Sequence, residues 1–243
     1  EQASARGHLQ ESPNGMLSFP FAIRNQFTAN LSSFQAISEM GSELNEWMQE
    51  FYEGISDEAS ADANQAYIFG SKEDDARSFH LADLILQHDI QVFSLKEDIS
   101  VNGQEFKAEN SYIVPVNQPQ YKLIEAMFET RTTFQDSLFY DISAWTYPMA
   151  FNLDYMALNS KILNLANVQE VSKETHEMKS GGVIGGTAAY QYALPWTDYY
   201  APKAAYDLLE KGFLVRVSTE EFATPEGQEF GRGTLLIGAG ESG

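Results

Sequence analysis

Apolar residues recur at helical spacing over a long stretch near the start of the chain. Within residues 30–52 they fall at Leu31, Phe34, Ile37, Leu44, Met48 and Phe51. This period predicts one long helix, and Gly54 stands where a C-terminal cap is expected. Residues 55–65 are rich in Ser, Asp, Glu and Ala without an apolar period, which predicts a linker. We therefore expect three segments: residues 1–54, a linker at 55–65 and a second domain at 66–243.

Beyond the linker, short apolar runs alternate with helical stretches. Residues 66–69 predict a strand, and Ser71 and Asp74 mark the start of a helix that continues to about His88. The pattern then predicts strands at residues 90–95 and 112–116, a turn at Asn102-Gly103 between them, and a helix over residues 119–128. This alternation is typical of an α/β protein with a parallel or mixed sheet flanked by helices.

A weak internal repeat supports this organisation. Residues 80–95 align without gaps with residues 204–219, and the same offset of 124 places Gly103-Gln-Glu-Phe106 on Gly227-Gln-Glu-Phe230. Each copy is expected to contain a helix, a strand, a turn, the Gly-Gln-Glu-Phe sequence and a further strand, which indicates a duplicated unit. In the first copy the last strand leads into a helix, so we expect a corresponding helix beyond Gly243.

Composition indicates a protein with a sizeable core. The 243 residues are 43% hydrophobic and 13% aromatic, which suits one or two domains, and no apolar run approaches the roughly 18 residues of a membrane span. The formal charge of -20, with 15 basic against 35 acidic residues, argues against nucleic acid and anionic membranes as partners. The chain has no cysteine, which excludes disulfides, thiolate zinc sites and a cysteine nucleophile.

The four histidines do not predict a metal site. His80 and His88 lie about 12 Å apart along one predicted helix, too far to share an ion. His176-Glu177 begins a His-Glu-x-x-His pattern that fails at Ser180, and the glycines of residues 181–186 lack the spacing of a phosphate loop. We expect no metal ligand and no cofactor-binding residue within this chain.

The first residues carry a family resemblance. Glu1-Gln-Ala-Ser-Ala-Arg-Gly7, the segment 15–27 with Phe19-Pro20, and the long helix follow one another as at the end of a zinc carboxypeptidase domain of the carboxypeptidase A type. The chain most resembles large bacterial zinc carboxypeptidase-like proteins that carry a class I glutamine-amidotransferase-like domain behind the peptidase. That resemblance extends through residues 112–120 and 133–145.

The resemblance implies a function for the parent protein. Glu1 matches the general base, which takes a proton from a zinc-bound water, and in the family the zinc ligands lie upstream of that glutamate. The chain would then be a fragment of a periplasmic or secreted metallocarboxypeptidase that acts on peptides and would be inert alone, and His8 would be placed near the cleft. Residues 66–243 would have a flavodoxin-like, amidotransferase-like fold without glutaminase activity, because that chemistry needs a cysteine.

Two other interpretations stay open. The chain can be a non-catalytic α/β module that binds a ligand or forms a homo-oligomer. It can also be a free-standing binding protein, which would require residues 1–54 to pack on the sheet domain, because the apolar face of the long helix would otherwise be exposed. Zinc ligands upstream of Glu1, and loss of activity on its substitution, would distinguish the peptidase from both.

Overall fold

The computed structural model describes residues 8–12, 15–72, 74–130, 133, 146–159 and 167–242 of a mixed α/β protein. Contacts divide the chain into two compact units, Glu1–Gly54 and Ile55–Gly243. Within the described residues, no helix combines the length and apolarity needed to cross a bilayer.

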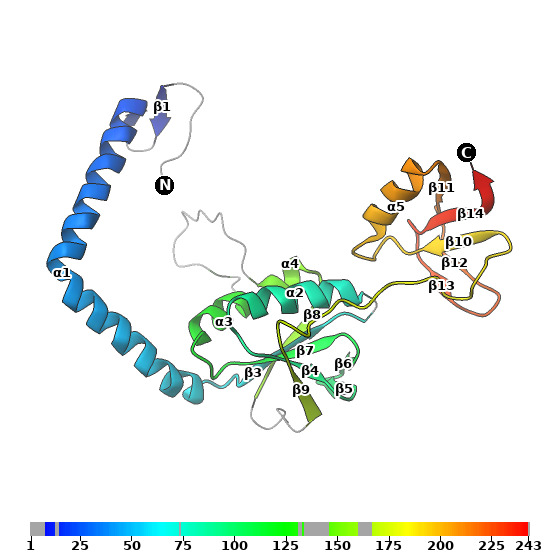
Figure 1. Cartoon of the computed structure of the whole chain (residues 1–243), viewed down its shortest axis with the longest axis horizontal. Coiled ribbons are helices and arrows are strands. Elements are labelled where there is room, and N and C mark those ends of the chain that lie inside the picture. The colour runs from blue at the N-terminus through cyan, green and yellow to red at the C-terminus, as the bar shows by residue number, and fades with distance from the viewer. Residues whose placement is uncertain are drawn as a thin grey trace. The chain divides into compact units, whose positions relative to one another are not determined.

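The first unit contains a hairpin and most of one long helix (Figure 1). Strands β1 (Leu9–Ser12) and β2 (Gly15–Ser18) pair antiparallel and lead directly into helix α1 (Phe19–Ala61). The predicted helix therefore exists but is longer at both ends, and Gly54 does not cap it. The helix bends at Met40, whose backbone is non-helical. The bend precedes Gly41 and Ser42, a pair of residue types that commonly kinks helices.

The predicted linker at 55–65 is wrong for most of its length. Residues 55–61 are the last turns of α1, and Ile55 and Ala59 are buried in the main core of the second unit. These two residues are four apart and lie on one helix face. The sequence did not predict this contact, because the residues around Ile55 and Ala59 are polar and only one face of these turns is buried.

A five-stranded sheet forms the centre of the second unit. Its order is β8 (Asp154–Leu158), β3 (Ala66–Gly70), β7 (Ser111–Pro115), β4 (Val92–Leu95) and β9 (Val168–Val171). All described neighbours pair antiparallel, so the expected parallel or mixed sheet is wrong. β3 and β4 run in the same direction, but β7 lies between them and pairs with both, as in a split β-α-β unit.

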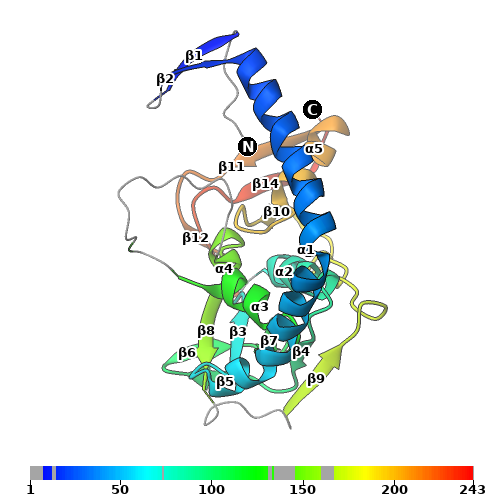
Figure 2. The ribbon, with the colours of Figure 1, turned by 90° about the vertical axis from the view of Figure 1, so that its left-hand side faces the viewer.

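Helices cover one face of this sheet, and a hairpin packs on the other (Figure 2). Helix α2 (Asp75–Gln87) and helix α3 (Tyr121–Phe128) share one core cluster with Tyr67, Phe69 and Val114. The opposite cluster joins Ile68 and Ile113 to strands β5 (Ile99–Val101) and β6 (Gln104–Phe106). The short helix α4 (Tyr147–Ala150) leads into β8. The order β3-α2-β4-β7-α3-β8 is the β-α-β-β-α-β connectivity of ferredoxin-like folds.

The internal repeat is confirmed as a repeat of topology. The second copy contains β10 (Gln191–Leu194), α5 (Ala201–Glu210), β11 (Phe213–Val217), β12 (Phe222–Ala223), β13 (Glu229–Phe230) and β14 (Leu235–Ser242). Its strand order β10-β14-β11 matches β3-β7-β4, and all pairs are antiparallel in both copies. Gly103 and Gly227, from the two Gly-Gln-Glu-Phe sequences, both have positive φ, which glycine adopts without strain.

In the last strand, however, the structurally equivalent residues of the two repeats are 123 positions apart instead of 124. Ile113 faces the hairpin, whereas Ile237, 124 positions later, packs with Ala205 of α5. The helix-facing counterpart of Ile237 is Val114. A shift of one residue reverses the faces of a strand, so sequence identity and structural equivalence diverge here.

Candidate ligand-binding cleft

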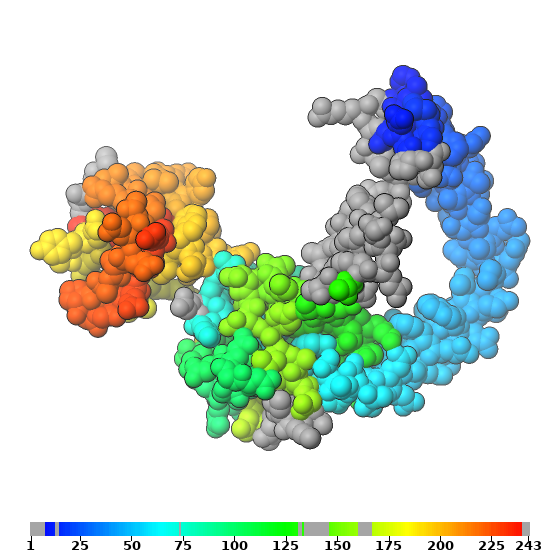
Figure 3. All heavy atoms as spheres, turned by 180° about the vertical axis from the view of Figure 1, so that it is seen from behind, coloured from blue at the N-terminus to red at the C-terminus, as the bar shows by residue number. Residues whose placement is uncertain are grey.

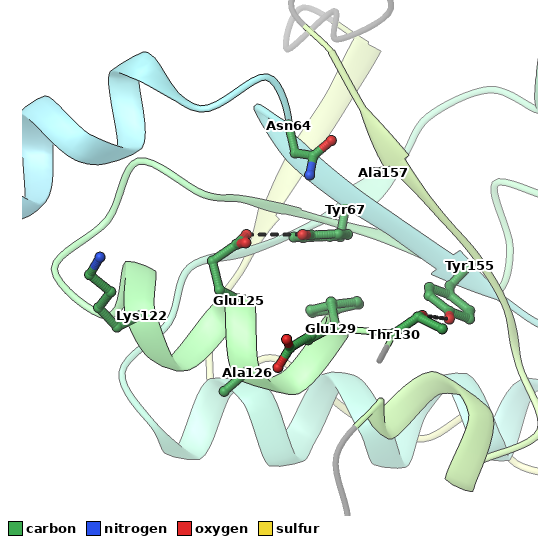
Figure 4. Close-up of a pocket in the computed structure, with 10 residues that line it drawn as sticks. Asn64, Tyr67, Lys122, Glu125, Ala126, Glu129, Thr130, Tyr155 and Ala157 are labelled. Atoms are coloured by element: carbon green, nitrogen blue, oxygen red, sulfur yellow. Dashed lines mark hydrogen bonds between the residues drawn. The ribbon is translucent and has the colours of Figure 1, made fainter. Parts of the chain in front are cut away.

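A cleft of about 530 Å³ lies beside helix α3 in the second unit (Figure 4). Strand β3 contributes Tyr67, strand β8 contributes Tyr155 and Ala157, and the remaining lining comes from α3 and the adjoining loops. Those remaining residues are Asn64, Lys122, Glu125, Ala126, Phe128, Glu129 and Thr130.

Tyr67 links the sheet to the helix at the cleft. Its ring stacks on Phe128 with centroids 4.5 Å apart, and its hydroxyl donates to Oε1 of Glu125 at 2.9 Å. Glu125 and Glu129 are one helical turn apart, so both carboxylates lie on this side of α3. At the β8 side, the hydroxyls of Thr130 and Tyr155 are hydrogen-bonded.

Burial is the main cause of the pKa shifts of Glu125 and Tyr67. It raises the pKa of Glu125 above its ordinary value, and the bond from Tyr67 only partly opposes that shift. The pKa of Tyr67 is also raised, first by burial and then by its bond to Glu125. A second pair lies nearby, where Tyr121 donates to Asp62 at 2.6 Å, and this hydrogen bond raises the pKa of Tyr121.

The arrangement suits recognition of a ligand that donates hydrogen bonds. Carboxylates and the Asn64 amide oxygen accept hydrogen bonds, and the half-buried Tyr155 adds an aromatic ring to the lining. Lys122 forms an ion pair with Glu58 at the edge of the cleft. The cleft therefore combines acceptors with aromatic surface.

The residues singled out in the sequence lie elsewhere. Glu1 lies outside the described residues, so the structure does not place the predicted general base. His8 is exposed, and its carbonyl accepts from the Phe19 N–H at 2.8 Å. His88 is the C-cap of α2.

The rings of His80 and His176 both lie close to the ring of Phe79, with His80 at 5.5 Å between centroids. His176 stacks on Phe79 at 4.2 Å, and His80 bonds the Tyr200 hydroxyl through Nε2 at 2.7 Å. Within the described part of the chain, no three histidine or acidic side chains are grouped to hold a metal ion. Of the glycines in residues 181–186, Gly185 and Gly186 have positive φ in an exposed turn.

Asp74, which the sequence indicated only as part of a helix start, is buried and hydrogen-bonded to segments far apart in the chain. Asp74 caps α2 by accepting from the N–H groups of Ala76 and Arg77, pairs with the Arg77 guanidinium at 2.7 Å, and accepts from the Tyr199 N–H at 2.8 Å. Arg77 in turn donates to the carbonyls of Phe151 and Thr197. The capping pattern indicated Asp74, but nothing in the sequence indicated its partner 125 positions away.

The chain is thus an α/β protein whose main sheet has an antiparallel, ferredoxin-like order of strands. The second repeat duplicates part of this topology. Comparisons with family models, with curated proteins and with solved structures find no match to this chain.

Proposed function

We propose that residues 1–54 are the C-terminal part of a zinc carboxypeptidase-like domain. Glu1 would act there as general base, with zinc held by residues upstream of it and with peptides as substrates. Export to the periplasm or the exterior belongs to the same proposal and rests on the resemblance alone. The supporting observation is the apolar surface of α1.

Helix α1 carries a long apolar face that is exposed in this chain. Phe27, Phe34 and Trp47 each expose more than three fifths of their surface. The face continues through Leu31, Ile37, Met40, Leu44, Met48, Phe51 and Tyr52. A surface of this extent is normally covered by another folded body.

The charges of the helix support a broad covering surface. Glu39, Glu46 and Glu53 recur at seven-residue spacing on the side opposite Phe34 and Leu44. Ser38, Met40, Asn45 and Trp47 hold the positions beside the Ile37, Leu44 and Phe51 row that are charged in a two-stranded coiled coil. Glu43 and Glu50 lie one turn from Trp47 and border the apolar face on one side only. The closing helix of a catalytic domain, packed against the body of that domain, would have this distribution.

The test uses the longer protein that this proposal implies. The general base acts on a zinc-bound water, so Glu1→Gln should retain about one zinc per molecule and lose turnover by about 10²-fold to 10⁴-fold. Zinc content and the release of C-terminal amino acids from peptides measure the two effects. Glu11→Gln, an exposed glutamate on β1, is the matched control and should keep full activity.

A protein that neither binds zinc nor releases C-terminal residues would refute the peptidase proposal. The second candidate, a non-catalytic ligand-binding role for residues 55–243, would then remain. The cleft beside α3 supports that role, whereas the amidotransferase-like order of strands has no support in an antiparallel sheet.

Ligand binding at the cleft has its own test. Amines and peptides ending in lysine or arginine offer the donors that Glu125 and Glu129 accept, so they should raise the thermal midpoint of the chain. Glu129→Gln should weaken that effect, because it removes an exposed carboxylate. Glu97→Gln, outside the cleft, should leave it unchanged.

A further inference from the structure

We propose that the outer edge of β10 and the adjoining side of α5 form a docking surface for an amphipathic helix followed by an antiparallel strand. The occupant would be a segment of the same polypeptide, packed as α3 and β8 pack on β3 in the first repeat. The two repeats differ in how far the corresponding residues of this surface are covered.

In the first repeat this surface is fully covered. β8 pairs with the outer edge of β3 from Ala66↔Leu158 to Gly70↔Asp154. Phe128 of α3 lies against the helix-side rings of β3, 4.5 Å from Tyr67 and 6.0 Å from Phe69. As a result, Tyr67 is 6% exposed and Phe69 is completely buried.

In the second repeat the corresponding positions are open. Within the described residues, β10 pairs with β14 alone and forms an edge of its sheet. Tyr192↔Ile237 is the counterpart of Tyr67↔Val114, because all four side chains face the helix side of their sheets. Tyr192 and Leu194 are only half-buried, since no counterpart of Phe128 covers them within the described residues.

Apolar residues of α5 are exposed in the same way, and Figure 3 shows orange atoms of this part of the chain at the surface. Asp198 accepts from the Tyr200 N–H just as Asp74 accepts from the Ala76 N–H, so the two aspartates hold corresponding positions, although α5 begins two residues later than α2 in this alignment. Tyr206 and Leu209 then occupy the positions of Ala82 and Ile85. Tyr206 is 75% exposed and Leu209 is 54% exposed, whereas Ala82 and Ile85 are completely buried in the core shared with α3.

A helix joined to a strand fits this surface better than a second copy of the chain. Two β10 edges related by a twofold axis would pair with each other but would leave Tyr206 and Leu209 exposed. β14 takes the place of β7, and in the first repeat β7 is followed along the same chain by α3 and β8. Residues 187–196 carry no charge, so an uncharged strand can pair there without burying an unpaired ion.

The test appends a copy of residues 118–159, which contain α3 and β8, after Gly243. The Ala239 N–H donates to the Tyr190 carbonyl, so the alternate residues Gln191 and Ala193 point their N–H groups to the free edge. We expect hydrogen exchange of these two amides to slow by about tenfold or more. Nitration of the Tyr206 ring should also decrease.

Two matched controls test the docking geometry. Replacing residues 154–158 of the appended copy by Gly and Ser should abolish the protection of Gln191 and Ala193. The host substitution Leu209→Glu should restore Tyr206 nitration, because it places a charge under the docked helix. Unchanged exchange at β10 in an extended chain whose first repeat remains folded would overturn the proposal. A dimer of the unextended chain, with β10 amides already protected, would overturn it in favour of a second copy.

Discussion

Asp74 shows how much one buried carboxylate can organise. It is 6% exposed, and it accepts from two N–H groups of α2, from the Arg77 guanidinium and from the N–H of Tyr199. The side chain of its counterpart Asp198 accepts from the Tyr200 N–H at 2.9 Å. The two aspartates therefore form a natural pair for comparison.

We predict that Asp74→Ala lowers the free energy of unfolding by about 2–4 kcal/mol. Loss of a cap costs about 1 kcal/mol, and buried donors without an acceptor cost about 1–3 kcal/mol more. Asp198 is not the N-cap of α5, which is Tyr200, so Asp198→Ala removes one exchangeable hydrogen bond and should cost about 0.5–1.5 kcal/mol. Urea unfolding followed by circular dichroism measures both, and equal effects would refute the wider role of Asp74.

Glu125 should make stability depend on pH in a specific direction. Burial raises its folded-state pKa above the ordinary value of 4.5, so the folded protein holds this proton more tightly than the unfolded chain. Its contribution to stability is therefore fully present below pH 4.5 and is lost as pH rises through the folded-state pKa. Glu125→Gln should remove this decline, and Glu129→Gln should retain it. Parallel pH profiles for wild type and Glu125→Gln in urea unfolding would contradict this.

At the scale of elements, the C-terminal end of α1 is where the structure departs most clearly from the sequence prediction. The apolar period correctly predicted a long helix around residues 30–52, but it gave no reason to extend the helix to Ala61. The extension is stabilised by burial of Ile55 and Ala59 against the sheet domain. Tertiary packing therefore stabilises helical turns that the local apolar pattern does not predict.

This difference gives a test of the boundary. Ile55→Ala should destabilise the second unit by about 2–4 kcal/mol, because it leaves a cavity at a site only 3% exposed. Leu44→Ala, on the same helix but exposed, should change stability by less than about 0.5 kcal/mol. If the two substitutions have equal effects in thermal unfolding, residues 55–61 behave as the linker that the sequence predicts.

The strands and helices of the first repeat were largely predictable. The expected strand at 66–69, the helix to about His88 and the helix ending at Phe128 correspond to β3, α2 and α3. The polar Glu125 sits between buried residues of α3, a local signal that could have indicated a site. Its partner Tyr67 could not be identified, because it comes from an apolar strand 58 positions away.

At the scale of the whole molecule, stability should be unevenly distributed. Residues 20–50 of α1 lack a covered face, and isolated helices are marginal in water. We predict that their amides exchange within seconds to minutes, whereas those of β3 and β7 exchange at the rate of global unfolding. Hydrogen exchange followed by mass spectrometry measures this, and slow exchange throughout α1 at low protein concentration would contradict it.

The order of the sheet was beyond sequence reasoning. Alternating strands and helices favour a parallel sheet when each helix connects adjacent strands. Here α2 connects β3 to β4, but β7 returns between them and makes every described pair antiparallel. Local patterns specify each strand, whereas the choice of neighbour depends on residues far apart in the chain.

The sequence by itself determined the class of the protein, the long apolar helix, the main elements of the first repeat and the repetition of its topology. These features depend on periodicity and turn chemistry, which are local. Only the tertiary structure decided the antiparallel order, the burial of Ile55, the face of each strand in the second repeat and the pairing of Tyr67 with Glu125. Each of these depends on contacts between distant segments, and a shift of one residue is enough to reverse which side chains are buried.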